Sequence, residues 1–200
     1  MRTTNHRPLM IAAALAVAAS LAACGADTPA DPVATTTDQT DATSHNDTDT
    51  EFVQMMILHH LGAVEMAQLA VENASSEEVR ELAGRIVAAQ DPEITLMAGW
   101  LDAWGEDRPA SAEHGGMDHG GMDMGGLDQG EAMTELEALT GDEFDRRFLQ
   151  LMTDHHRGAI EMAEHLLDDG ENMPARELAR TIIRDQEAEI ATMAQMLPPH

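Results

Sequence analysis

The sequence predicts an all-α fold, an antiparallel four-helix bundle built from two repeated helix pairs. Residues 52–101 align without a gap with residues 148–197, at an offset of 96 and with 21 identities in 50 pairs. A repeat of this length indicates two copies of one supersecondary unit. Within each copy the apolar residues recur three and four positions apart, which is the helical period. Aromatic residues make up only 2% of the chain, so aliphatic side chains and Met have to fill the core.

The first 23 residues resemble the signal peptide of a bacterial lipoprotein. A charged start with Arg2 and Arg7 precedes an apolar run at 9–19, which is too short for a spanning helix. Small residues then lead to Cys24, the single cysteine of the chain, at the place where such signals carry their acylated residue. The sequence therefore predicts export and a lipid anchor at Cys24 on the extracytoplasmic face of the cell membrane. An ordinary signal peptide with a chance cysteine is the alternative.

Residues 24–48 read as a disordered tether, because they are rich in Thr, Asp, Ala and Pro and lack apolar periodicity. One folded domain is expected at 49–197. The net charge of −26 and the absence of Lys argue against nucleic acid as a partner, since phosphate binding needs a basic face. Acylation of Cys24 would leave no thiol for a disulfide or a thiolate metal site. The oligomeric state stays open, a homo-oligomer included.

Each repeat is expected to form two helices joined by a short turn. The predicted helices cover residues 49–73, 76–104, 140–168 and 172–197, and a Gly-rich connection covers 105–139. Their starts carry capping signals at Thr48-Asp49-Thr50-Glu51, Ser75-Ser76-Glu77-Glu78, Thr140-Gly141-Asp142-Glu143 and Asn172 with Pro174. Gly105 and Gly170 follow helix ends, and Pro198 stops the last helix. Pro92 predicts a kink or short break near residues 90–91.

A histidine lies in the middle of each predicted core seam. The seams of the first and third helices are Phe52, Met56, His59, Ala63, Met66 and Ala70, and Phe148, Met152, His155, Ala159, Met162 and Leu166. His60 and His156 lie about 100° further round, at the flank of the seam. The facing seams each carry one Gln and one Glu, namely Gln90, Glu93, Gln186 and Glu189. Buried polar groups need partners, so these four predict a polar layer in which they meet His59 and His155.

The paired histidines beside methionines favour a soft metal ion. The candidate ligands on the helices are Met56, His59, His60, Met66, Met152, His155, His156 and Met162. Imidazole and thioether together suit copper. The alternative is a layer that only fixes helix register, with Met as core filler. Glu65 and Glu161 are also repeated but point away from the flank histidines, so a surface ion pair or an inter-helix hydrogen bond is their default role.

The Gly-rich connection contains a second candidate metal site. Its potential ligands are His114, Met117, His119, Met122 and Met124. Exposed methionine contributes little to solubility, whereas thioether with imidazole suits Cu(I), and the glycines would let the segment wrap around an ion. A flexible linker with incidental methionines is the alternative.

The doubled helix M-x-x-H-H-x-G-A-[VI]-E-M-A, followed by a helix with R-E-L-A and Q-x-x-E-I-x-x-M, resembles the bacterial family called domain of unknown function 305. The resemblance covers about residues 50–104 and 143–197. It implies an exported ferritin-like four-helix bundle associated with copper. Carried over by position, the motif residues are the helical His and Met named above.

Three functions compete for this sequence. The first is copper binding, with Cu(I) favoured, for sequestration or transfer. The second is a structural or partner-binding helical module whose polar layer holds no ligand. The third, a ferritin-like di-iron oxidase, is disfavoured because such sites need Glu-x-x-His, which the chain lacks. The chain is therefore not expected to be an enzyme.

Overall fold

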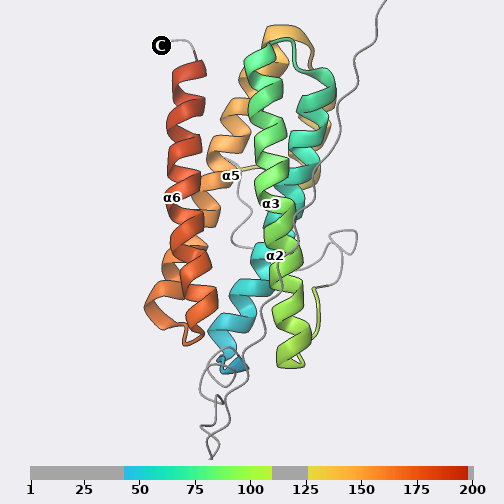
Figure 1. Cartoon of the computed structure of the whole chain (residues 1–200). Helices are drawn as coiled ribbons and strands as arrows, with labels where there is room; N and C mark the ends of the chain where they lie inside the picture. The colour runs from blue at the N-terminus through green and yellow to red at the C-terminus, as the bar shows by residue number, and fades with distance from the viewer. Residues whose placement is uncertain (1–42, 110–125, 198–200) are drawn as a thin grey trace, which may run out of the picture. The chain divides into compact units, whose positions relative to one another are not determined.

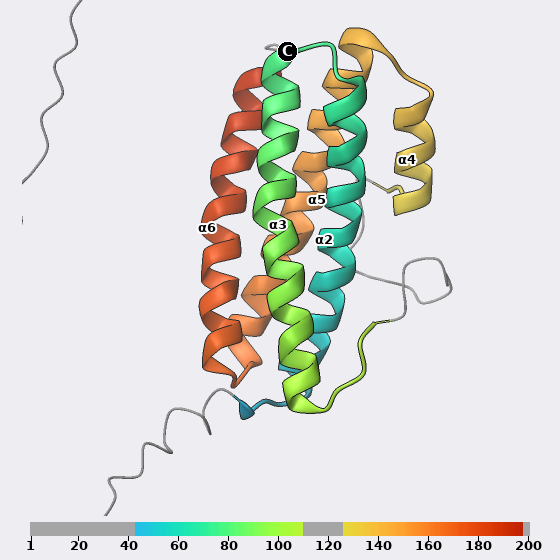
Figure 2. The same cartoon turned by 45° about the vertical axis from the view of Figure 1, so that its right-hand side comes forward.

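Four long helices lie side by side, and a fifth, short helix packs on their outside (Figure 1, Figure 2). The structure is a computed structural model, and it describes residues 43–109 and 126–197. The helices are α2 (Asp47–Asn73), α3 (Glu77–Trp104), α4 (Gln129–Glu137), α5 (Gly141–Asp169) and α6 (Met173–Met196). Those ranges contain no strand, and the predicted all-α four-helix bundle is confirmed. None of these described helices has the length and apolar character that crossing a membrane requires.

The packing order follows the repeat. Each repeat folds as an antiparallel pair, α2 with α3 and α5 with α6, and the two pairs meet through α2 and α5. The core therefore has two apolar clusters along the bundle. One contains Met66, Leu82 and Phe148, and the other contains Phe52, Leu101 and Leu166. The predicted seams thus form the core, although Met162 is only partly buried.

The helix ends agree with the predictions except at two caps. α2 is capped by Asn46, not Thr48: Asn46 Oδ1 accepts from Asp49 N at 3.0 Å, and Asp49 Oδ2 accepts from Asn46 N at 2.9 Å. Asn caps at least as well as Thr, so the earlier box prevails. Within the described residues, Thr140 makes no side-chain cap hydrogen bond to α5. Gly141 has a φ of 62°, outside the helical conformation that a capping box needs at that position.

Helix α3 runs without a break through Pro92, so the short break expected there does not occur. Proline removes one backbone hydrogen bond. Ile86 and Met97 are both fully buried, so the helix is packed on either side of the proline. The predicted cap at Ser76 is present, because its side chain accepts from Val79 N, and Gly105 ends the helix with a φ of 79°.

Two aspartates related by the repeat tie each helix pair to the turn of the other. Asp145 Oδ2 accepts hydrogen bonds from Ser76 N at 2.8 Å and from Ser75 Oγ at 2.6 Å. Its counterpart Asp49 is fully buried and accepts from the backbone N–H of Asn172 at 3.0 Å. Gly170 makes room for it, since a Cβ there would lie 2.7 Å from the Asp49 carboxylate. The sequence analysis did not predict these contacts.

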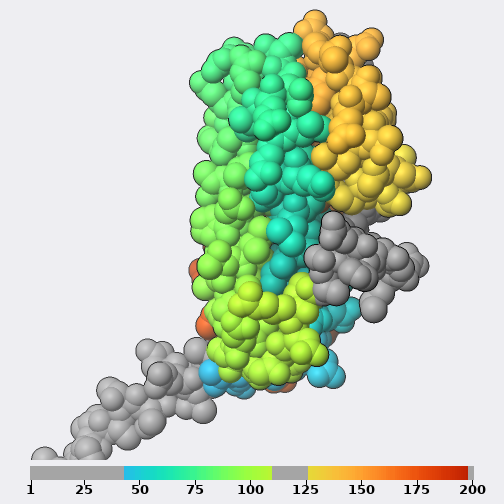
Figure 3. All heavy atoms as spheres, turned by 90° about the vertical axis from the view of Figure 1, so that its right-hand side faces the viewer, coloured from blue at the N-terminus to red at the C-terminus, as the bar shows by residue number. Residues whose placement is uncertain are grey.

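Helix α4 was not predicted, because the connection at 105–139 was expected to lack a helix. Its N-cap Asp128 forms a capping box with Glu131. Ala132 and Leu136, four residues apart, are fully buried against the bundle. This capping box and spacing were the available signals. In the space-filling view α2 lies between α3 and α4 at the surface (Figure 3).

Candidate metal centre

Four histidines lie in the middle of the bundle, between the two apolar clusters. α2 supplies His59 and His60, and α5 supplies His155 and His156. All four are at most 1% exposed. We call the group made by these histidines with Gln90, Glu93, Gln186 and Glu189 the polar layer.

The seam histidines contact each other. The ring centroids of His59 and His155 are 3.6 Å apart and the rings are tilted by 44°. Among the described residues, none of their four ring nitrogens has a hydrogen-bond partner of normal geometry. Loss of solvent, and then the nearby imidazoles, lower the pKa of His59 and of His155 well below 6.5. Both rings are therefore neutral at physiological pH, with a lone pair available on each.

The flank histidines bind carboxylates instead. His60 Nε2 donates to Glu93 Oε2 at 2.7 Å, and His156 Nε2 donates to Glu189 Oε2 at 2.6 Å. Both Nδ1 atoms are buried and lack a partner in the described part of the chain. A carboxylate accepts only, so Nε2 is the protonated nitrogen and Nδ1 is the nitrogen left for another partner. We call these two Nδ1 atoms and the four nitrogens of the seam pair the open nitrogens.

The expected pairing inside the layer was therefore wrong in one respect. We expected His59 and His155 to meet the Gln and Glu side chains, but the flank histidines meet the Glu. The reason is the helix order: α2 and α5 are neighbours, so their seam histidines meet each other. A side chain 100° further round reaches the second helix of its own repeat. Gln90 and Gln186 are buried, and their Oε1 atoms have no partner in residues 43–109 and 126–197.

The structure places the candidate methionines at two distances from the layer. Met56 and Met152 are fully buried and lie one turn from His60 and His156 on their own helices. Met66 and Met162 follow the seam histidines by seven residues, about 10 Å along the axis, so they lie outside the layer. The role of all four methionines as metal ligands stays a prediction. Cys24 and the candidates His114, Met117, His119, Met122 and Met124 lie outside the described residues.

Two further methionines adjoin the layer. Met97 and Met193 are fully buried and follow Glu93 and Glu189 by four residues. Neither was among the metal ligands predicted from the sequence. The signal that identifies them is their spacing from the carboxylates that bind His60 and His156. In the described ranges, no three His, Cys, Asp or Glu side chains are grouped so that they could hold a metal ion.

The start of α4 contacts α2 next to the layer. Gln129 Nε2 donates to Gly62 O at 3.1 Å and to Glu65 Oε2 at 3.0 Å. Glu65 thus has the inter-helix hydrogen bond that was its default role. A Cβ on Gly62 would lie 2.8 Å from Gln129 Oε1, so this glycine leaves room for the Gln129 side chain, not for a neighbouring backbone.

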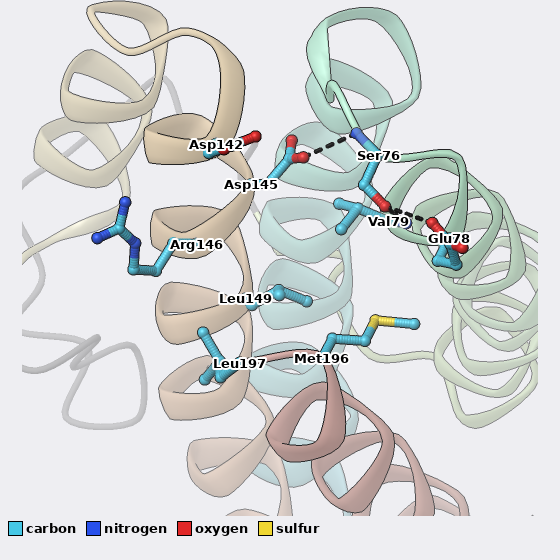
Figure 4. Close-up of a pocket in the computed structure, with 9 residues that line it drawn as sticks. All are labelled: Ser76, Glu78, Val79, Asp142, Asp145, Arg146, Leu149, Met196 and Leu197. Carbon is cyan, nitrogen blue, oxygen red and sulfur yellow. Dashed lines mark hydrogen bonds between the residues drawn. The ribbon is translucent and has the colours of Figure 1, made fainter. Parts of the chain in front are cut away.

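A cavity of about 570 Å³ lies at one end of the bundle, away from the layer. It is lined by Ser76, Glu78, Val79, Asp142, Asp145, Arg146, Leu149, Met196 and Leu197 (Figure 4). Asp145 is already engaged there with the backbone N–H of Ser76 (Figure 4). The cavity contains none of the open nitrogens.

Comparison with known proteins places the chain in a family. A model of the domain of unknown function DUF305 matches residues 49–197. The chain belongs to the DUF305 family. A putative secreted DUF305 protein from Streptomyces coelicolor is 36% identical, with a TM-score of 0.63 over 78% of this chain and 93% of that one. A DUF305 fragment from Deinococcus radiodurans is 32% identical, with a TM-score of 0.63 over 76% and 95%.

A third relative of this DUF305 chain was solved with metal ions. CopM in its Cu(II)-bound form is 34% identical, with a TM-score of 0.61 over 74% of this chain and 94% of CopM. CopM was also solved in Cu(I)-bound and Ag-bound forms. No curated protein matches the chain. The descriptions of the family and of these relatives name no enzymatic reaction.

Proposed function

We propose that this DUF305 protein is an exported, lipid-anchored copper-binding protein that holds Cu(I) at its polar layer, for sequestration or transfer. The observation that carries the proposal is the set of open nitrogens sealed in the core. A buried polar atom without a partner costs about 1–3 kcal/mol, and a metal ion offsets this cost at the nitrogens that carry a lone pair, at most one on each of the four rings. The Cu(I)-bound, Cu(II)-bound and Ag-bound forms of CopM support a metal as that ligand.

The donor set favours a soft monovalent ion. Neutral imidazole nitrogens and the buried thioethers of Met56 and Met152 are the ligands that select Cu(I). Glu93 and Glu189 are the only carboxylates bound to the layer's histidines in the described chain. Each of these two carboxylates can balance one monovalent cation. Each carboxylate also orients its imidazole, as the outer partner of a metal-bound histidine does.

The test is Cu(I) affinity, measured without oxygen against a chromophoric chelator. The protein carries Cys24→Ala and Ala at positions 114, 117, 119, 122 and 124, so that only the bundle competes with the chelator for Cu(I). We expect His59→Ala with His155→Ala to lose affinity at least tenfold. The matched control is His165→Ala on α5, whose side chain is 66% exposed, and it should change nothing. Unchanged affinity in the double variant would refute the assignment to the layer.

The structural module remains the second candidate. The hydrogen bonds His60–Glu93 and His156–Glu189 favour it, because each joins the two helices of a repeat and could fix their register. If the layer serves only helix register, the protein should have the same melting temperature with and without Cu(I). A ligand that binds only the folded state at 100 times its Kd adds about 2.7 kcal/mol, which a melting curve resolves.

A further inference from the structure

The bridges from histidine to carboxylate divide the polar layer into two halves that face opposite ends of the bundle. α2 and α3 are antiparallel and are joined by His60–Glu93. A residue four before His60 and a residue four after Glu93 therefore lie on the same side of that bridge. These residues are Met56 and Met97, and both belong to the apolar cluster that contains Phe52.

The second repeat has the same arrangement on the opposite side. His156–Glu189 joins α5 and α6. Met152, four before His156, and Met193, four after Glu189, belong to the other apolar cluster, which contains Phe148. All four methionines are fully buried. Each half thus has one imidazole Nδ1 without a partner among the described residues and two thioethers one turn away from the bridge.

We propose that the layer holds two soft monovalent metal ions, one in each half, and that Met97 and Met193 complete the two ligand sets. This inference rests on the proposed function. The Met97 half-site consists of Met56, His60 and Met97, the Met193 half-site consists of Met152, His156 and Met193, and each ion takes one further nitrogen from the seam pair of His59 and His155 between them. Two thioethers and two imidazoles form a soft, neutral ligand set. The paired Glu93 or Glu189 carboxylate gives each half-site one negative charge for one monovalent ion.

The two half-sites are not equivalent, because one sulfur has a polar neighbour. Thr153 Oγ1 has one hydrogen, which it donates either to Leu149 O at 2.7 Å or to Met193 Sδ at 3.7 Å. The residue that corresponds to Thr153 in the first repeat is Ile57, which has no hydroxyl. An ion at Met193 must displace this contact. The Met97 half-site therefore binds first, with an affinity roughly three- to tenfold higher, the range that one weak hydrogen bond provides.

The experiment counts Ag(I) or Cu(I) ions on the full chain by native mass spectrometry during titration. The chain again carries Cys24→Ala, since a thiolate would compete for the ion, and Ala at 114, 117, 119, 122 and 124. We expect two ions. Met97→Leu should lose the tighter one and Met193→Leu the weaker one, because Leu keeps the packing but has no sulfur. Circular dichroism and melting curves verify that each variant folds.

The repeat supplies the matched controls. Met66→Leu changes a methionine that is equally buried but lies outside the layer, so it should keep both ions. Thr153→Ile should tighten the Met193 half-site, and Ile57→Thr should weaken the Met97 half-site, each by the same three- to tenfold factor. X-ray absorption at the copper edge should find two sulfurs and two nitrogens for each Cu(I). Fewer than two sulfurs would refute the ligand sets independently of any variant.

The outcomes separate this inference from the proposed function. If Met97→Leu and Met193→Leu both keep two ions while His59→Ala with His155→Ala loses affinity, the two half-sites are wrong and the copper-binding function stands. A single ion bound by the unsubstituted layer also overturns the two-ion inference. If the layer binds no ion at all, the proposed function itself fails.

Discussion

Replacement of both seam histidines by leucine should stabilise the metal-free protein. In the described structure the ring nitrogens of His59 and His155 are buried without partners. An unsatisfied buried polar group costs about 1–3 kcal/mol, so the two rings together cost roughly 2–6 kcal/mol. Leucine removes that cost, but its branched shape in a close ring contact offsets part of the gain by about 1–3 kcal/mol. The net expectation is a gain of about 2 kcal/mol in the free energy of unfolding.

The assay is thermal and denaturant unfolding of the metal-free chain in the presence of a chelator. For a folded part of this size, 1 kcal/mol shifts Tm by about 2–4 °C, so the gain corresponds to roughly 4–8 °C. The matched control is His60→Leu with His156→Leu. Those rings hold Glu93 and Glu189, so their loss leaves two carboxylates without their hydrogen bonds and should lower Tm.

The opposite result would refute the reasoning. If His59→Leu with His155→Leu lowers the stability of the metal-free protein by 1 kcal/mol or more, the seam imidazoles have favourable contacts in the folded state. The layer would then be a satisfied polar network, and the register function would gain support. Addition of Cu(I) completes the comparison, since it should stabilise the unsubstituted protein and leave the leucine variant unchanged.

Three further predictions concern pH, metal affinity and turn stability. Because His59 and His155 stay neutral when folded but titrate near pH 6.5 when unfolded, the metal-free protein should lose stability as pH falls below 6.5 and stay level above it. The slope is up to about 1.4 kcal/mol per pH unit for each histidine, read between pH 5 and 6.5 and absent in the leucine variant. Glu93→Gln with Glu189→Gln should weaken Cu(I) binding about 10–100-fold in the chelator assay, because the carboxylates orient the imidazoles; unchanged affinity would exclude that role. Asp145→Ala should cost about 2–4 kcal/mol in urea unfolding, because three donors of the turn before α3 lose a charged acceptor.

The helical part of the fold could be predicted because its signals are local. A helix with a three-and-four apolar period buries that stripe wherever its partners lie, so Met56, Ala63 and Ala159 are buried as expected. The repeat then fixed how many helix pairs to expect. The inward position of His59 and His155 followed from the same stripe.

The rest depends on which helices are neighbours, and spacing along one helix does not contain that information. The flank position of His60 was predictable, but its bond to Glu93 requires that α2 pairs with α3. In the same way Asp49 caps a turn 122 residues away, at Glu171. Helix α4 has only nine residues, too short for a periodic signal to stand out within a Gly-rich connection.

The histidines that bind carboxylates and the histidines without partners contribute differently to the stability of the layer. Helix register needs directional contacts between helices, and the bridges His60–Glu93 and His156–Glu189 already supply one for each repeat. The contact between His59 and His155 adds no hydrogen bond to these, and it keeps both rings buried at a cost in stability. A purely structural layer would be more stable with apolar side chains at these two positions. Under the proposed function, a metal ion supplies partners for these imidazoles. Binding of the ion should therefore stabilise the layer.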